Sequence, residues 1–137
     1  MTHNLVMVIY MIMAGLLSSM YIWVDKISDI RITLNDIYMI TLMTGWMLLF
    51  MNIGNNLMVS VISIIVILIS LLGIRRQVGV NKKIFFKGMI PHHSMAIHVS
   101  KELLKKGEEM TDEERRLIKS IIETQEREIK LMRRLEK

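Results

Sequence analysis

The last third of the chain holds a string of side chains that can bind a metal, Met89-Ile-Pro-His92-His93-Ser-Met95. Thioether sulfur selects Cu(I), and imidazole accepts Cu(I), Cu(II) or Zn(II). The chain contains no cysteine, so disulfides and thiolate metal sites are excluded. Copper is therefore the metal that this string predicts.

A helical hairpin is predicted to bring a second group of donors against the string. Apolar side chains recur every three or four residues over about 81–106 and again after residue 111, which is typical of amphipathic helices. Gly107 and the capping-box sequence that opens at Thr111 place a short turn between two antiparallel helices. The start of the first helix then meets the end of the second. The donors expected there are Gln125, Glu128 and Met132.

Two alternatives stay open for this cluster. In the first, imidazoles and thioethers hold a copper ion. In the second, His93 is hydrogen-bonded to Gln125 or Glu128 as a satisfied buried polar pair, and the methionines fill space. Pro91 lies inside the helical pattern, and we expect one kinked helix because the apolar phase continues across it. His98 is expected on the far side of that helix, where it joins the site only through another chain.

Residues 85–135 resemble the family catalogued as domain of unknown function 305. Its Met-Ile-Pro-His-His and Ile-Ile-x-x-Gln-x-x-Glu-Ile-x-x-Met patterns are matched at 89–97 and 121–132. The resemblance implies a ferritin-like helical bundle that in some members binds copper through Met and His, and a branch with three N-terminal spans is similar to this chain. The ligand candidates that it implies are Met89, His92, His93 and Met132, with Gln125 and Glu128 in support. Two further supporting candidates are Met95, beside His92, and His98, which stands where soluble relatives often have Asp.

Three apolar runs precede the hairpin and are predicted to cross a membrane, at residues 5–24, 37–53 and 57–74. About twenty helical residues at ~1.5 Å each cover the ~30 Å hydrocarbon layer. Residues 25–36 are predicted to be a short polar loop, and the turn formers at 52–56 separate the second and third spans. We therefore expect a membrane domain over residues 1–76 and the helical hairpin over 77–137.

Charge is divided unevenly between these two parts. Residues 1–74 carry 3 acids and 2 bases, whereas residues 75–137 carry 16 bases and 10 acids. Because Arg75 and Arg76 directly follow the third run, the positive-inside rule puts the hairpin in the cytoplasm and the N-terminus outside, in a bacterial inner membrane. Signs alternate along the helical faces of the basic part, so nucleic-acid binding is not expected.

A methionine stripe marks the second span at Met39, Met43, Met47 and Met51. Successive members are four residues apart, so all four lie near one another on a helix. A set of three spans whose middle member carries Met-x-x-x-Met is similar to the Ctr copper transporters, which leaves a copper-conducting channel as one alternative. The other alternative is that these methionines only pack between helices.

No nucleophile, base and acid set is visible, and the Glu-x-x-His motifs of a di-iron site are absent, so the chain is not expected to be an enzyme. A hairpin of about 55 residues has a thin core, and we expect two copies to form a four-helix bundle in a homodimer. The sequence thus predicts an all-α protein, anchored in the lipid bilayer by three transmembrane helices, with a ferritin-like hairpin that sequesters copper. A non-metal oligomerisation or regulatory module is the remaining alternative.

Overall fold

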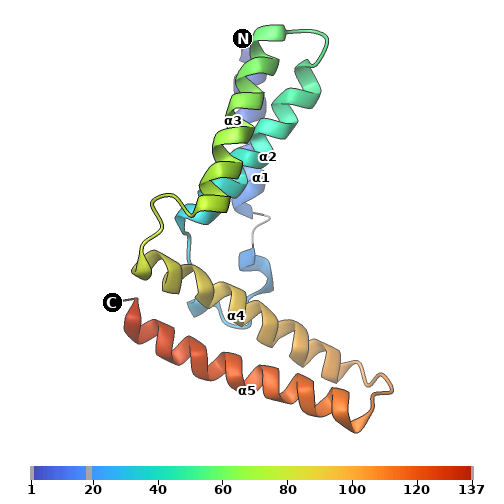
Figure 1. Ribbon diagram of the computed structural model, residues 1–137. Coiled ribbons are helices and arrows are strands. Elements are labelled where there is room, and N and C mark those ends of the chain that lie inside the picture. The colour runs from blue at the N-terminus through green and yellow to red at the C-terminus, as the bar shows by residue number, and fades with distance from the viewer. Residues whose placement is uncertain (1, 18–19, 137) are drawn as a thin grey trace. The chain divides into compact units, whose positions relative to one another are not determined.

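The structure is a computed structural model that describes residues 2–17 and 20–136 (Figure 1). These residues form helices and turns and no strand, which confirms the all-α class. The helices are α1 (Thr2–Leu17), α2 (Leu34–Asn52), α3 (Leu57–Arg76), α4 (Lys82–Lys105) and α5 (Asp112–Leu135). Two short 3-10 turns, η1 (Met20–Trp23) and η2 (Ile27–Asp29), lie between α1 and α2.

The chain divides into two compact units, and the second one is discontinuous in sequence. The apolar unit contains α1, α2 and α3, whereas the C-terminal unit combines residues 20–33 with α4 and α5. We call residues 20–33 the strap. The structure thus divides the chain differently from the predicted boundary at residue 76, because the strap belongs with the hairpin.

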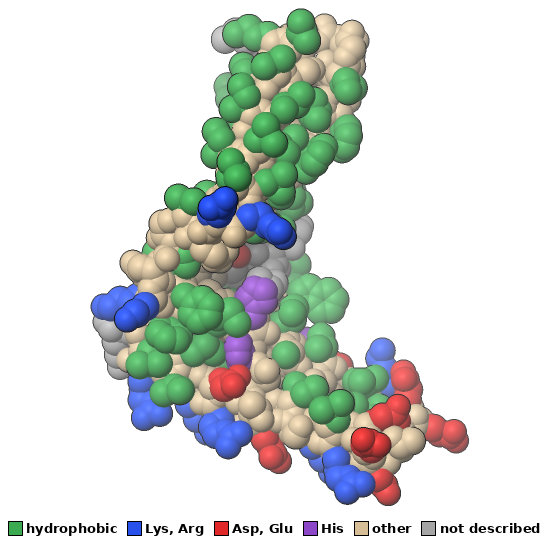
Figure 2. All heavy atoms as spheres, viewed as in Figure 1, with side chains coloured by type: hydrophobic (Ala, Val, Ile, Leu, Met, Phe, Trp, Pro, Cys, Tyr) green, Lys and Arg blue, Asp and Glu red, His purple; other side chains and the backbone are tan. Residues whose placement is uncertain are grey.

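The apolar unit contains two helices that are long and apolar enough to cross a membrane, α2 with 19 residues and α3 with 20. Most side chains of α3 are exposed in the single chain, whereas most of those of α2 are half-buried, and Figure 2 shows hydrophobic side chains spread over the visible surface of this unit. The predicted first span, residues 5–24, is not confirmed at that length. The apolar helix ends at Leu17 and η1 is a separate turn in the other unit; residues 18–19 of that span lie outside the described residues.

Small residues bring α2 and α3 together. Gly45 and Gly73 are buried, and a Cβ atom added at Gly73 would lie 2.7 Å from a ring carbon of Tyr38. Ser63 and Ser70 are also buried on α3, and the Ser63 hydroxyl donates to the Val59 carbonyl at 2.8 Å. Such small side chains let the backbones of two apolar helices approach closely.

The C-terminal hairpin has the start and stop signals that its sequence predicts. The Asn81 side chain caps α4 by accepting from the Ile84 N–H at 3.0 Å, and Gly107 takes a left-handed φ of 69° after the helix. Thr111 and Glu114 form the expected capping box of α5. Helix α4 continues through Pro91, as the phase of its apolar residues predicts.

The core of the hairpin is small and is supported from outside by the strap. It consists of Ile90 and Ile97 on α4 with Ile129 and Met132 on α5. Ser94, on the same side of α4 as Ile90 and Ile97, is completely buried because the strap packs over that side. The strap is therefore the third layer of this unit, although the sequence predicts residues 20–24 as the end of the first span and residues 25–33 as part of a polar loop.

Candidate metal site

The site is built around His93, which lies between its own helix and α5. Its Nδ1 atom is 2.8 Å from the carbonyl oxygen of Met89, one turn earlier on α4. Its Nε2 atom is 2.8 Å from Oε2 of Glu128 on α5. The His93 side chain is 15% exposed and that of Glu128 is 47% exposed. The imidazole is thus held at both nitrogens at the edge of the hairpin.

The two partners of His93 assign a role to each ring nitrogen. A carbonyl oxygen only accepts, so the Nδ1 atom carries the hydrogen and donates it to Met89. The 2.8 Å contact between Nε2 and Glu128 needs one hydrogen between the two atoms, so Nε2 can offer a lone pair to another ligand only when Glu128 moves away. Metal-bound histidines are oriented in this way, with the other ring N–H donated to a carbonyl or carboxylate.

Two methionines belong to the part of the hairpin that holds this imidazole. Met89 provides the carbonyl that orients the ring, and its side chain packs against the core cluster that contains Met132. Met132 is 7% exposed. The structure therefore pairs His93 of α4 with Glu128 of α5 and packs Met89 against the cluster that contains Met132, as the antiparallel hairpin predicts.

The other predicted ligands lie apart from this group. His92 is exposed, because neighbouring positions of a helix point about 100° apart and His93 takes the inward one. Gln125 is half-buried, and no hydrogen bond joins it to either histidine in the described part of the chain. Met95 is half-buried as well.

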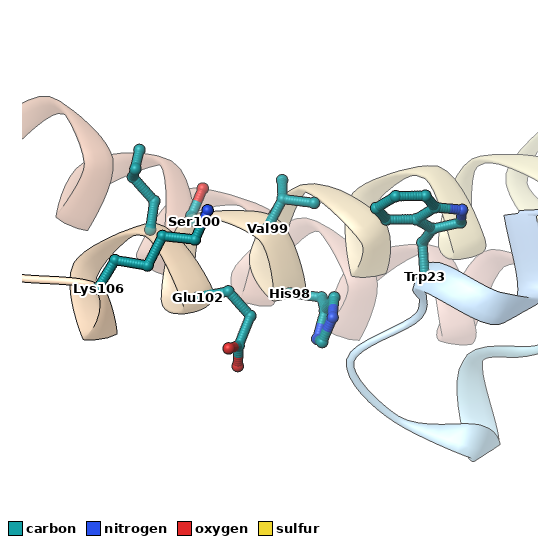
Figure 3. A pocket seen from close by; sticks show the side chains of 7 residues that line it. Trp23, His98, Val99, Ser100, Glu102 and Lys106 are labelled. Carbon is teal, nitrogen blue, oxygen red and sulfur yellow. The ribbon is translucent and has the colours of Figure 1, made fainter.

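His98 lies on another face of α4, as predicted. It lines an open pocket of about 390 Å³ with Trp23 of the strap and with Glu102 and Lys106 further along α4. Figure 3 shows its ring beside Trp23, with Val99 and Ser100 along the same helix. Among residues 2–17 and 20–136, no three His, Asp or Glu side chains gather closely enough to hold a metal ion.

None of the four methionines of the α2 stripe is buried in the single chain. Met39 and Met43 are exposed, and Met47 and Met51 are half-buried in the single chain. The buried positions of α2 are Thr44, Gly45 and Asn52.

The strap contributes charged groups that sequence reasoning did not assign to this unit. Lys101 of α4 pairs with Asp25 of the strap at 2.9 Å, and this hydrogen bond raises the pKa of Lys101. Arg31 binds both carboxylate oxygens of Glu136, at 3.1 and 2.9 Å. Hydrogen bonding to Arg31 lowers the pKa of Glu136, and the same bond raises the pKa of Arg31. The signal available in the sequence was the presence of acids and an arginine between two apolar runs.

Comparison with known proteins gives two matches. Residues 75–136 match the family described as Domain of unknown function (DUF305). The chain is 40% identical over 134 residues to an uncharacterized protein from Acanthamoeba polyphaga mimivirus, a match that covers 93% of this chain and 87% of the relative. No solved structure matches the chain.

Proposed function

Because this chain belongs to the DUF305 family, whose domain covers residues 75–136, we propose that it is a membrane-anchored protein that binds copper in its C-terminal hairpin and serves in copper sequestration. The ligands are Nε2 of His93 and the thioethers of Met89 and Met132, with Glu128 beside them. The observation that carries the proposal is the double constraint on the His93 ring, 2.8 Å from the Met89 carbonyl and 2.8 Å from Glu128.

The donor set favours Cu(I) over other metals. Soft thioethers bind Cu(I), whereas Mg²⁺ and Ca²⁺ require a shell of oxygen ligands. One imidazole, two thioethers and one carboxylate offer few oxygens and no thiolate. When bound, copper would displace the Glu128 hydrogen bond from Nε2, and Glu128 would balance part of the metal's charge.

The anchor is supported by the exposure of α2 and α3. Leu68 and Ile69 in the middle of α3 are 54% and 61% exposed, and water is a poor solvent for such a surface. An apolar helix of 20 residues is about 30 Å long, the thickness of the hydrocarbon layer. Lipid is therefore the environment that we propose for these helices, with α1 as a third, shorter apolar element.

The proposed topology puts the whole C-terminal unit on the cytoplasmic side. The strap precedes α2 and residues 81–136 follow α3, so both flank the same helical hairpin and fold into one unit. Arg75 and Arg76 end α3 on that side, in agreement with the positive-inside rule.

Copper titration of the full-length protein in a neutral detergent tests the function. A colorimetric Cu(I) chelator serves as competitor, and His93→Ala is compared with His98→Ala, which changes an imidazole on another face of the same helix. We expect His93→Ala to weaken Cu(I) binding at least tenfold and His98→Ala to leave it unchanged. X-ray absorption of the bound copper should show sulfur and nitrogen neighbours.

A non-metal module is the second candidate, and the burial of Met132 favours it. A core methionine at 7% exposure packs the hairpin whether or not a metal is present. If the wild type and both variants bind Cu(I) equally and weakly, the copper-binding function is excluded and the non-metal module remains. The Met39 and Met43 stripe supports a third proposal, a copper channel, whose test is Cu(I) flux into liposomes with Met43→Leu/Met47→Leu as the inactive control.

A further inference from the structure

Two matching rows of side chains lie on the side of the hairpin that the strap leaves open. Each row advances by alternate steps of four and three residues, the spacing that forms a seam between packed helices. The row on α4 is Phe85, Met89, His92, Ala96, Val99 and Leu103, and the row on α5 is Leu117, Ile121, Thr124, Glu128, Leu131 and Leu135. We call these twelve positions the open face, and none of them is buried in the single chain.

The strap packs against a different side of both helices. On α4 it binds Ser94, and on α5 it binds Arg133. Ala96 lies two residues from Ser94, and Leu131 lies two residues from Arg133. Two positions along a helix are about 200° apart around its axis. The strap therefore supports the hairpin from one side, and the open face is on the other side.

The open face is mostly apolar. Its larger hydrophobic side chains Phe85, Val99, Leu117, Leu131 and Leu135 are 42–60% exposed. Figure 2 shows hydrophobic side chains along the visible face of the C-terminal unit, on both sides of histidine side chains. A continuous exposed apolar surface of this kind marks a site where a protein binds a partner.

The open face is large enough for a stable pair of hairpins. Each row spans 18 residue steps, which makes it about 27 Å long at ~1.5 Å per residue. Two packed helices are roughly 20 Å wide, so the face covers about 500 Å² in each copy. Two copies together would bury about 1,000 Å², the area that a specific protein interface requires.

We propose that the open face binds the open face of a second copy of this chain, so that two hairpins form one four-helix bundle. The sequence predicts a homodimer from the thin core of the hairpin, and the open face adds the residues that form its interface. The two-fold axis runs along the helices, so that α4 of one copy lies against α5 of the other. All neighbouring helices are then antiparallel.

The polar residues of the open face favour this arrangement. Positions 92 and 128 lie at the same level of the hairpin, because the neighbouring His93 contacts Glu128. The two-fold axis places His92 of one copy opposite Glu128 of the other, and the pairing occurs twice. Within the described part of the chain, Glu128 uses its Oε2 atom for His93, which leaves Oε1 for this second imidazole. A carboxylate in the middle of an apolar row also opposes insertion of this face into lipid.

Cross-linking between two copies tests the pairing. The chain has no cysteine, so each introduced thiol is unique. Full-length Ala96→Cys and Thr124→Cys, which carry tags of different length, are reconstituted together into phosphatidylcholine liposomes and oxidised with diamide. The matched control replaces Thr124→Cys with Glu123→Cys, whose exposed thiol points to another side of α5. Circular dichroism verifies that the variants are folded.

We expect at least tenfold more mixed disulfide from the test pair than from the control pair. Adding Leu131→Glu to both chains should reduce the mixed product at least tenfold, because it places a charge in the interface. Adding Ile27→Glu instead, at an exposed position of the strap, should leave the product unchanged.

Equal amounts of product from the test and control pairs would overturn the proposal. A disulfide between two Ala96→Cys chains without the mixed product would place α4 against α4 and would also overturn it. Absence of any product overturns it as well. If the liposomes then shield the Ala96→Cys thiol from a water-soluble maleimide, the open face is assigned to lipid instead.

Discussion

The hydroxyl of Ser94 donates a 2.8 Å hydrogen bond to a carboxylate oxygen of Asp29, although 65 positions separate the two residues in the chain. Both are almost fully buried, Ser94 at 0% and Asp29 at 2% exposure. The same hydroxyl accepts from the backbone N–H of Asp25 at 2.9 Å. One small side chain on α4 therefore fixes the strap at two points.

Replacing Asp29 with Asn should destabilise the C-terminal unit by roughly 2–3 kcal/mol. The change leaves Arg133 without its counter-charge, which costs ~3–5 kcal/mol in a fully buried pair, and less here because the Arg133 side chain is 39% exposed. Urea unfolding in a Trp46→Phe background reports this unit alone, since Trp23 is then the only tryptophan. Glu108→Gln, at an exposed carboxylate, is the control and should shift the midpoint little.

Glu136 should make the C-terminal unit sensitive to acid. Because hydrogen bonding to Arg31 lowers the pKa of Glu136 below its ordinary value of 4.5, the folded state favours the ionised form. Its stabilisation is complete above pH 4.5 and is lost as the pH falls through the lowered pKa. Unfolding midpoints measured from neutral to acid pH should show the wild type above Glu136→Gln at neutral pH and the difference closing in acid. A constant difference across this range would contradict the assignment.

Thr111→Ala should weaken the start of α5 by about 1 kcal/mol. The Thr111 hydroxyl accepts from the Glu114 N–H at 3.2 Å, and Glu114 accepts from the Thr111 N–H at 2.7 Å. Thr111→Ser keeps both bonds and should retain the wild-type stability. Thermal unfolding followed by circular dichroism compares the two variants, and equal losses in both would remove the capping box as the cause.

Gly73→Ala should destabilise the packing of α2 on α3 by about 1–3 kcal/mol, the cost of overpacking a close contact. The new methyl group would lie 2.7–2.9 Å from three ring carbons of Tyr38, whose hydroxyl is held by a 2.9 Å hydrogen bond to the Val78 carbonyl. Trp46 fluorescence in a Trp23→Phe background reports this unit during denaturation. Leu72→Ala, at a neighbouring exposed position, should destabilise the unit less. A larger loss of stability in Leu72→Ala than in Gly73→Ala would contradict the close contact between Gly73 and Tyr38.

Local signals in the sequence predicted the hairpin well. The turn at Gly107 and the capping box at Thr111 depend on neighbours within a few residues, and both are where the sequence places them. The antiparallel pairing that follows from a short turn correctly placed His93 opposite Glu128. His92 is exposed, so the pairing brings one of the two adjacent histidines against α5.

The strap could not be predicted because its partners are distant in sequence. Asp29 and Arg133 are 104 positions apart, and no periodicity in residues 20–33 marks that pairing. The end of α1 at Leu17 could not be predicted either, because the apolar run continues from residue 5 to residue 24. Composition indicates solubility in lipid along that run and does not show that η1, at its end, packs against α4.

Because the C-terminal unit is discontinuous in sequence, its two parts are synthesised at different times. The ribosome completes the strap first, then the apolar pair α2 and α3, and only at the end Arg133 and Glu136, the residues that bind Asp29 and Arg31. Residues 20–33 therefore lack their final partners while about a hundred further residues are synthesised. At ~5–20 residues per second this takes several seconds. A chain that stopped a few residues early would contain the strap and the apolar helices but would lack the partners that close the C-terminal unit.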